Sequence, residues 1–158
     1  MQEITRYLSL NMCENALFLA ERLYYSLPNE ENLLLMARCY VHDKEWKKTQ
    51  LLLKGCCSPS CRYLLSLSLF HLGELNEAER ILFGKLTPFS DSASLSDHKK
   101  GKLLTTIPEE EVGLYLLGQI CRKGGRIEMA AQYFSLCLEV FEKNSFLIQN
   151  CGLILSNN

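Results

Sequence analysis

The stretch NALFLAERLYYSLPNEENLLLMARCYV, residues 15–41, decides the fold class. Its first half repeats apolar residues at intervals of three and four, as one face of an amphipathic helix does. Pro28 ends this helix, because a proline cannot continue the helical hydrogen bonds. Asn29 can cap a second helix, and Glu30 and Glu31 favour the positive end of its dipole. The stretch therefore predicts two helices joined by a short hinge.

The same helical spacing continues on both sides of this stretch. It predicts further helices that end near Gly55, Gly73 and Gly84. Later helices are expected from Pro108 to about Arg122, over 127–142, and over 146–155 after a cap at Asn144 and Ser145. Residues 85–107 are rich in Ser, Thr, Lys and Asp without a sustained period, which predicts a surface loop.

A 34-residue period fits these helix pairs. In a unit that begins at Glu111, Gly118 takes position 8, Ala130 position 20 and Phe134 position 24. Small residues at the first two positions let the two helices approach, and the aromatic ring fills the space between them. Three more units match the same pattern less completely at the same positions, and in one of them Thr49 replaces a small residue. The pattern resembles the tetratricopeptide repeat (TPR) and predicts an all-α TPR solenoid of antiparallel helix pairs.

These units suggest a single domain over residues 1–158. The expected repeats cover about 1–28, 29–57, 58–84 and 108–142, followed by a partial repeat over 145–156, with the loop 85–107 as an insertion. Such repeats bury a core only against their neighbours. The result is a curved array whose concave face is made by the first helix of each pair.

Composition and charge exclude several functions. A net charge of −1 argues against a basic face for nucleic acid or an anionic membrane. There is no run of 18 apolar residues, as a membrane span would need, and the N-terminus lacks the features of a secretory signal. The eight cysteines are then expected to be reduced thiols in the nucleus or cytoplasm.

The cluster Cys56, Cys57 and Cys61 raises the question of a zinc site. A fourth ligand would have to be Cys39 or His71, and neither belongs to a recognisable ligand pair. Structural thiols are therefore favoured over a metal, and disulfide or redox use is a further alternative. No histidine has a nucleophile and an acid at motif spacing, so neither an enzyme, a cofactor nor a small-molecule substrate is expected.

Positions 2, 5, 9 and 12 of each first helix face the groove of a TPR array. In the second and third repeats position 2 holds Glu31 and Ser60, and the other three positions hold a mostly apolar set: Leu34, Arg38, Val41, Tyr63, Leu67 and Phe70. An exposed apolar strip of this kind is expected to be buried against another surface. The N-terminal helix carries a second apolar stripe, with no preceding repeat to cover it: Ile4, Tyr7, Leu8 and Met12.

The segment FLAERLYYSLPNEENLLLMARCYV, together with LLLKGCCSPSCRYLLSLSLFHLGELNEAERIL, resembles one family closely. This is the N-terminal domain of the cell-division-cycle-27 subunit of the anaphase-promoting complex. The resemblance implies a non-catalytic scaffold of a ubiquitin ligase in cell-cycle control, which pairs with a second copy of itself and contacts other subunits. In that family the repeats that bind activator tails lie further along the chain.

Two arrangements of the N-terminal stripe follow. In the first, the N-terminal helix of each protomer lies in the groove of the other, as an isologous two-fold contact. In the second, the stripe packs on neighbouring helices of its own chain. A rival function is a TPR adaptor that binds a peptide of another protein in the groove. Arg38 and Arg122 alone, however, do not make the carboxylate clamp of co-chaperone adaptors.

Overall fold

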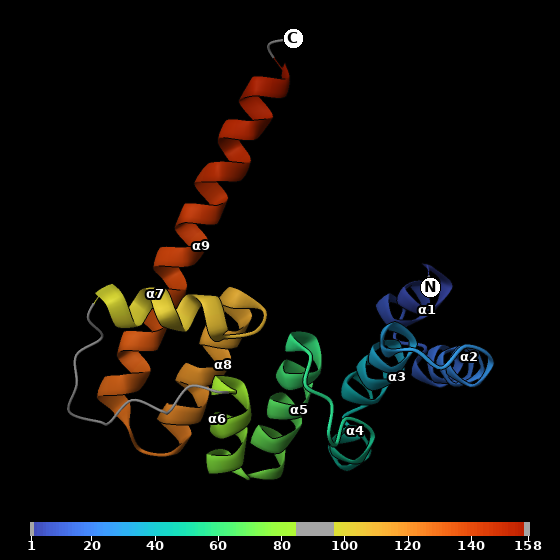
Figure 1. The fold of residues 1–158 in the computed structure, drawn as a ribbon. Coiled ribbons are helices and arrows are strands. Elements are labelled where there is room, and N and C mark those ends of the chain that lie inside the picture. The colour runs from blue at the N-terminus through green and yellow to red at the C-terminus, as the bar shows by residue number, and fades with distance from the viewer. Residues whose placement is uncertain (1, 85–96, 157–158) are drawn as a thin grey trace. The chain divides into compact units, whose positions relative to one another are not determined.

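The computed structural model describes residues 2–84 and 97–156, and all regular structure in these ranges is helical (Figure 1). This confirms the predicted all-α class. The helices, in chain order, are α1 (Gln2–Ser9), α2 (Cys13–Ser26), α3 (Glu30–His42), α4 (Trp46–Leu52), α5 (Pro59–Leu72), α6 (Leu75–Phe83), α7 (Asp97–Thr106), α8 (Glu110–Lys123) and α9 (Ile127–Ser156).

The hinge between α2 and α3 is fixed by two side-chain amides. The side chain of Asn29 accepts a hydrogen bond of 2.8 Å from the backbone N–H of Asn32, which confirms the predicted cap. The buried side chain of Asn32 donates in turn to the carbonyl oxygen of Leu27, also at 2.8 Å. The end of one helix and the start of the next are thereby tied together.

The borders of α5 also follow the predicted signals. Ser58 accepts from the backbone N–H of Cys61 at 3.4 Å, and Pro59 is the first helical residue. At the other end Gly73 has φ +87°, a left-handed conformation that a residue with a Cβ seldom adopts. The chain can therefore turn directly into α6.

Two sequence-based expectations about the later part of the chain are wrong. Residues 97–106 form the helix α7 where a loop was expected, because Leu103 and Ile107 are spaced to bury one face. Residues 85–96 lie outside the described ranges. The predicted cap at Asn144 and Ser145 is absent, and α9 continues to Ser156 without a break. The side chain of Asn144 donates to the carboxylate of Glu111 in α8 instead of capping a new helix.

The chain divides into two compact units, Met1–Ile81 and Leu82–Asn158. In the first unit each helix from α1 to α5 packs on the next one, and α3 also contacts both α1 and α5. The helices that begin each pair are thus neighbours, as in a TPR layer. In the second unit α8 packs along α9. Within the described ranges, no helix combines the length and hydropathy needed to cross a membrane.

The small residues of the repeat signature lie where helices approach most closely. Gly118 faces the ring of Phe134, so that a Cβ at this position would lie 2.7 Å from Cδ1 and 2.9 Å from Cζ. In the third pair the hydroxyl of Ser66 donates to the carbonyl oxygen of Ala78 at 2.7 Å. Thr49 fits the place of a small residue because it is fully buried and its hydroxyl donates to the carbonyl oxygen of Glu45 at 3.2 Å.

Candidate functional site

The predicted groove residues of the second and third repeats come from two helices in contact, α3 and α5. We call this set the inner strip, and it consists of Leu34, Arg38, Val41, Tyr63, Leu67 and Phe70. Arg38 is exposed, and the five apolar members are half-buried. The first unit therefore presents an apolar surface that its own helices cover only in part.

Most of the N-terminal stripe packs on neighbouring helices of its own chain, which is the second of the two arrangements considered from the sequence. Ile4 is only 3% exposed and lies in a core cluster with Ala16 and Ala20 of α2. Tyr7 and Leu8 are half-buried and pack against the same cluster. The physical reason is that α1 occupies the place of a first helix in its own repeat, so its apolar stripe closes the end of that core.

Met12 is the member of the stripe that stays accessible, with 43% of its surface exposed in the turn after α1. Its backbone N–H donates to the carbonyl oxygen of Tyr7 at 2.9 Å, and Asn11 before it has a φ of 61°. The turn therefore has a specific backbone conformation, with one residue in the left-handed region. Of the four predicted residues, Met12 can contact another molecule most readily.

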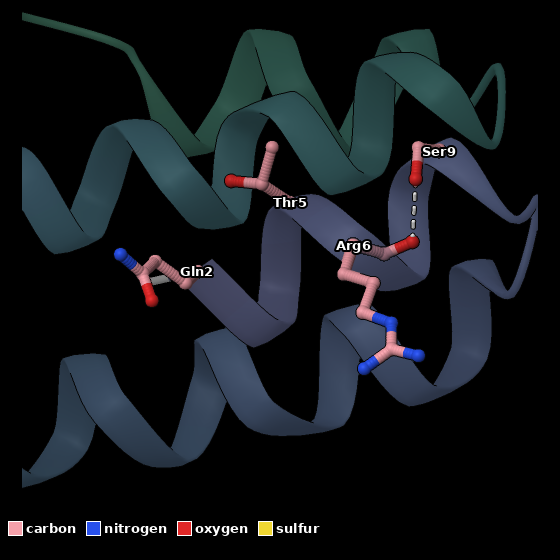
Figure 2. A pocket seen from close by; sticks show the side chains of 4 residues that line it. All are labelled: Gln2, Thr5, Arg6 and Ser9. Carbon is pink, nitrogen blue, oxygen red and sulfur yellow. Dashed lines mark hydrogen bonds between the residues drawn. The ribbon is translucent and has the colours of Figure 1, made fainter.

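The opposite face of α1 is polar and slightly hollowed (Figure 2). Gln2, Thr5, Arg6 and Ser9 line a shallow depression of about 420 Å³, and they follow the helical spacing of three and four. The hydroxyl of Ser9 donates to the carbonyl oxygen of Arg6 at 2.8 Å, the contact drawn as a dashed line. This face offers one cation and hydrogen-bonding groups, so it does not add to the apolar surface of the inner strip.

The cysteine cluster at the start of α5 is divided by burial. Cys61 is completely buried, and this burial raises the pKa of its thiol. Cys57 is exposed and its thiol donates to the carbonyl oxygen of Gly55 at 3.6 Å. His71, the suggested fourth zinc ligand, instead stacks on Trp46 with 4.0 Å between ring centroids and 8° between planes.

Among the residues that the structure describes, no group of three or more His, Cys, Asp or Glu side chains is arranged to hold a metal ion. The other suggested ligand, Cys39, is 1% exposed, and burial raises its pKa to about 11. Such a thiol keeps its proton at neutral pH in the metal-free chain. The zinc alternative thus finds no ligand set in the described part of the chain.

One pair of reactive side chains has no counterpart in the sequence analysis. The Sγ atom of Cys13 lies 3.3 Å from Nδ1 of His42, although the two residues are 29 positions apart. No motif spacing links them, since they meet only when α2 and α3 fold against each other. The one signal in the sequence is that each stands at the border of a predicted helix.

Comparison with known proteins adds the family context. Residues 9–85 match the family model described as "Anaphase-promoting complex, cyclosome, subunit 3". The cell division cycle protein 27 homolog A of Arabidopsis thaliana is 37% identical over 127 residues, which are 80% of this chain and 16% of that protein. The cell division cycle protein 27 homolog of Rattus norvegicus is 35% identical over 136 residues, 84% of this chain and 15% of that protein.

The Homo sapiens homolog is 41% identical over 92 residues, which are 50% of this chain and 11% of that protein. The chain thus spans less than a fifth of the length of these relatives. The family match includes α2 to α6 and with them every member of the inner strip.

Proposed function

Because this chain belongs to the family of subunit 3 of the anaphase-promoting complex, we propose that it is a homodimerising, non-catalytic scaffold module of that complex. Its partners are then a second copy of itself and other subunits of the complex, in the nucleus and cytoplasm. The observation that carries the pairing is the inner strip, because five half-buried apolar side chains on two adjacent helices form a surface suited to burial by a partner.

The charges beside the strip favour a second copy as that partner. Glu31 and Arg38 are both exposed on α3 and stand seven positions apart, which places them on the same face of the helix. Two α3 helices that cross antiparallel about a two-fold axis would set Glu31 of each copy near Arg38 of the other. Leu34 would lie close to the axis, and the contact would be isologous.

The remaining predicted interface residues take unequal parts in this arrangement. Met12 can reach a partner at the edge of the strip, since it is exposed. Tyr7 and Leu8 can contribute only the part of their surface that the core leaves open. Ile4 supports the position of α1 from within the core and makes no contact with the partner.

Light scattering behind a sizing column tests the pairing across a dilution series. We expect a mass near twice 18.1 kDa that persists to low micromolar concentration. Leu67→Glu should give a folded monomer, because the charge would be buried twice in a two-fold contact. If each substituted copy reduces the free energy of association by about 2 kcal/mol, the dimer loses about 4 kcal/mol. Its dissociation constant then rises roughly a thousandfold.

The matched control is Leu51→Glu, the same exchange at a residue of α4 that is 64% exposed and lies outside the strip. It should leave the mass unchanged. Glu31→Arg and Arg38→Glu should each weaken pairing, and the double exchange should restore it. A parent chain that is monomeric throughout the dilution series would refute the homodimer and leave the strip to a peptide of another protein, as in a TPR adaptor.

A further inference from the structure

The ends of α2 and α3 bring a thiol and an imidazole together. Cys13 is the first residue of α2 and His42 is the last residue of α3. The distance between Sγ and Nδ1 is 3.3 Å, within hydrogen-bonding range for a sulfur atom. The thiol is half-buried and the histidine is exposed, so small molecules in solution can reach the pair.

Two turns hold these helix ends in place. The turn before α2 has Asn11 at φ 61°, and the turn after α3 has Lys44 at φ 60°. The backbone N–H of Glu45 donates to the carbonyl oxygen of Tyr40 at 2.9 Å, which closes the second turn over the end of α3. The contact between Cys13 and His42 is therefore set by backbone geometry as well as by the side chains.

Cys13 also differs from Cys39, a thiol with which it interacts. Cys39 lies one helical turn before His42 and is 1% exposed. Burial, with a smaller contribution from the neighbouring Cys13, raises the pKa of Cys39 to about 11. Cys39 therefore stays protonated and inaccessible at neutral pH, whereas Cys13 combines access with a nearby base.

We propose that Cys13 is a nucleophilic thiol that reacts with low-molecular-weight disulfides of the glutathione class, with His42 as its proton acceptor. In the tautomer that carries its proton on Nε2, the Nδ1 atom accepts the thiol proton. The sulfur of Cys13 then attacks one sulfur atom of the disulfide. A nucleophile with a base in hydrogen-bond reach is the arrangement that activates such attack.

The exchange balances without any further reactant. A new S–S bond forms between Cys13 and the attacked sulfur, and the original S–S bond of the small disulfide breaks. The departing thiolate takes the proton that His42 held and leaves as a free thiol. Cys13 is oxidised to the mixed disulfide, while one half of the small disulfide is reduced.

The test measures the rate of mixed-disulfide formation at each cysteine with oxidised glutathione at pH 7. Samples are quenched with acid, the remaining thiols are alkylated, and peptides are quantified by mass spectrometry. Cys57 is the internal reference, because it is more exposed and its thiol, like that of Cys13, donates to a backbone carbonyl two residues earlier, but no histidine is among its described contacts. Cys57 also interacts with the guanidinium of Arg62, so the comparison does not favour Cys13. We expect Cys13 to react about tenfold faster than Cys57, a conservative gain for a positioned base.

His42→Gln should slow Cys13 to the rate of Cys57 without changing the rate at Cys57 itself. Because His42 is exposed, the exchange should leave the helical circular dichroism unchanged. In the parent chain, a Cys13 that reacts no faster than Cys57 overturns the proposal. A His42→Gln chain in which Cys13 keeps the parent rate also overturns the proposal. The comparison of Cys13 with Cys57 needs only the parent chain.

Discussion

The contact between Gly118 and Phe134 allows a sharp test of how the second unit packs. A Cβ at residue 118 would lie 2.7 Å from Cδ1 and 2.9 Å from Cζ of the ring, and closer still to Cε1. Real Cβ atoms essentially never come under 3.0 Å, so either the ring or the helix must move. Gly118→Ala should therefore strain the pairing of α8 with α9.

The magnitude follows from two opposing effects. Overpacking of a fitted core costs about 1–3 kcal/mol. Alanine gains up to about 1 kcal/mol over glycine inside a helix. We therefore expect Gly118→Ala to lower the free energy of unfolding by about 1–2 kcal/mol. Gly101→Ala in α7 is the control, since a Cβ there would meet nothing within 4 Å and should only gain helix propensity.

A double-mutant cycle decides whether the ring is the cause. Phe134→Ala removes all three clashing ring atoms, so Gly118→Ala should cost nothing in that background and can even stabilise the chain. The assay is urea unfolding followed by circular dichroism, at one protein concentration for all variants because dimers link stability to concentration. An equal cost in both backgrounds would refute the contact as the reason for the glycine.

Two further predictions concern other parts of the chain. Asn144→Ala should destabilise the chain by about 1 kcal/mol in urea unfolding, because it removes the hydrogen bond from α9 to Glu111; an unchanged midpoint would contradict this. Stability should fall as the pH rises from about 9 to about 11, because folded Cys39 retains a proton that the unfolded thiol releases. Cys39→Ala should make this decline shallower, and an equally steep decline would exclude Cys39 as a contributor.

The pairing of helices could be predicted because local rules decide it. Asn29, Ser58 and Gly73 act within a few residues of their own helix ends, and the structure uses all three as caps. The small residues of the repeat follow a fixed period, so the approach of Phe134 to Gly118 was also accessible from the sequence. Such signals need no knowledge of the rest of the chain.

The misplaced elements depend on contacts between residues far apart in the sequence. Asn144 resembles a helix cap, which would accept from a backbone N–H, yet its side-chain amide donates to the carboxylate of Glu111, 33 positions earlier. The turn into α8 is a further feature that the sequence pattern did not reveal, although the residues in contact there are close in the sequence. Glu109 adopts φ 58°, and a Cβ on Gly113 would lie 2.6 Å from Cγ2 of Ile107. The missing side chain at Gly113 thus lets Ile107 lie against the start of α8.

The position of α1 changes which surface is open for pairing. An apolar stripe at the start of a repeat array can close its own core or enter a partner, and the sequence pattern is the same in both cases. Because Ile4 is buried among residues of α2 and α3, withdrawing α1 to reach a partner would expose that cluster to water. Burial of an isoleucine side chain contributes about 1.5–3 kcal/mol, which a partner's groove would have to replace before any affinity was gained. The proposed pairing through the inner strip leaves this core intact, so Leu67→Glu should affect the proposed dimer while Ile4→Ala affects folding.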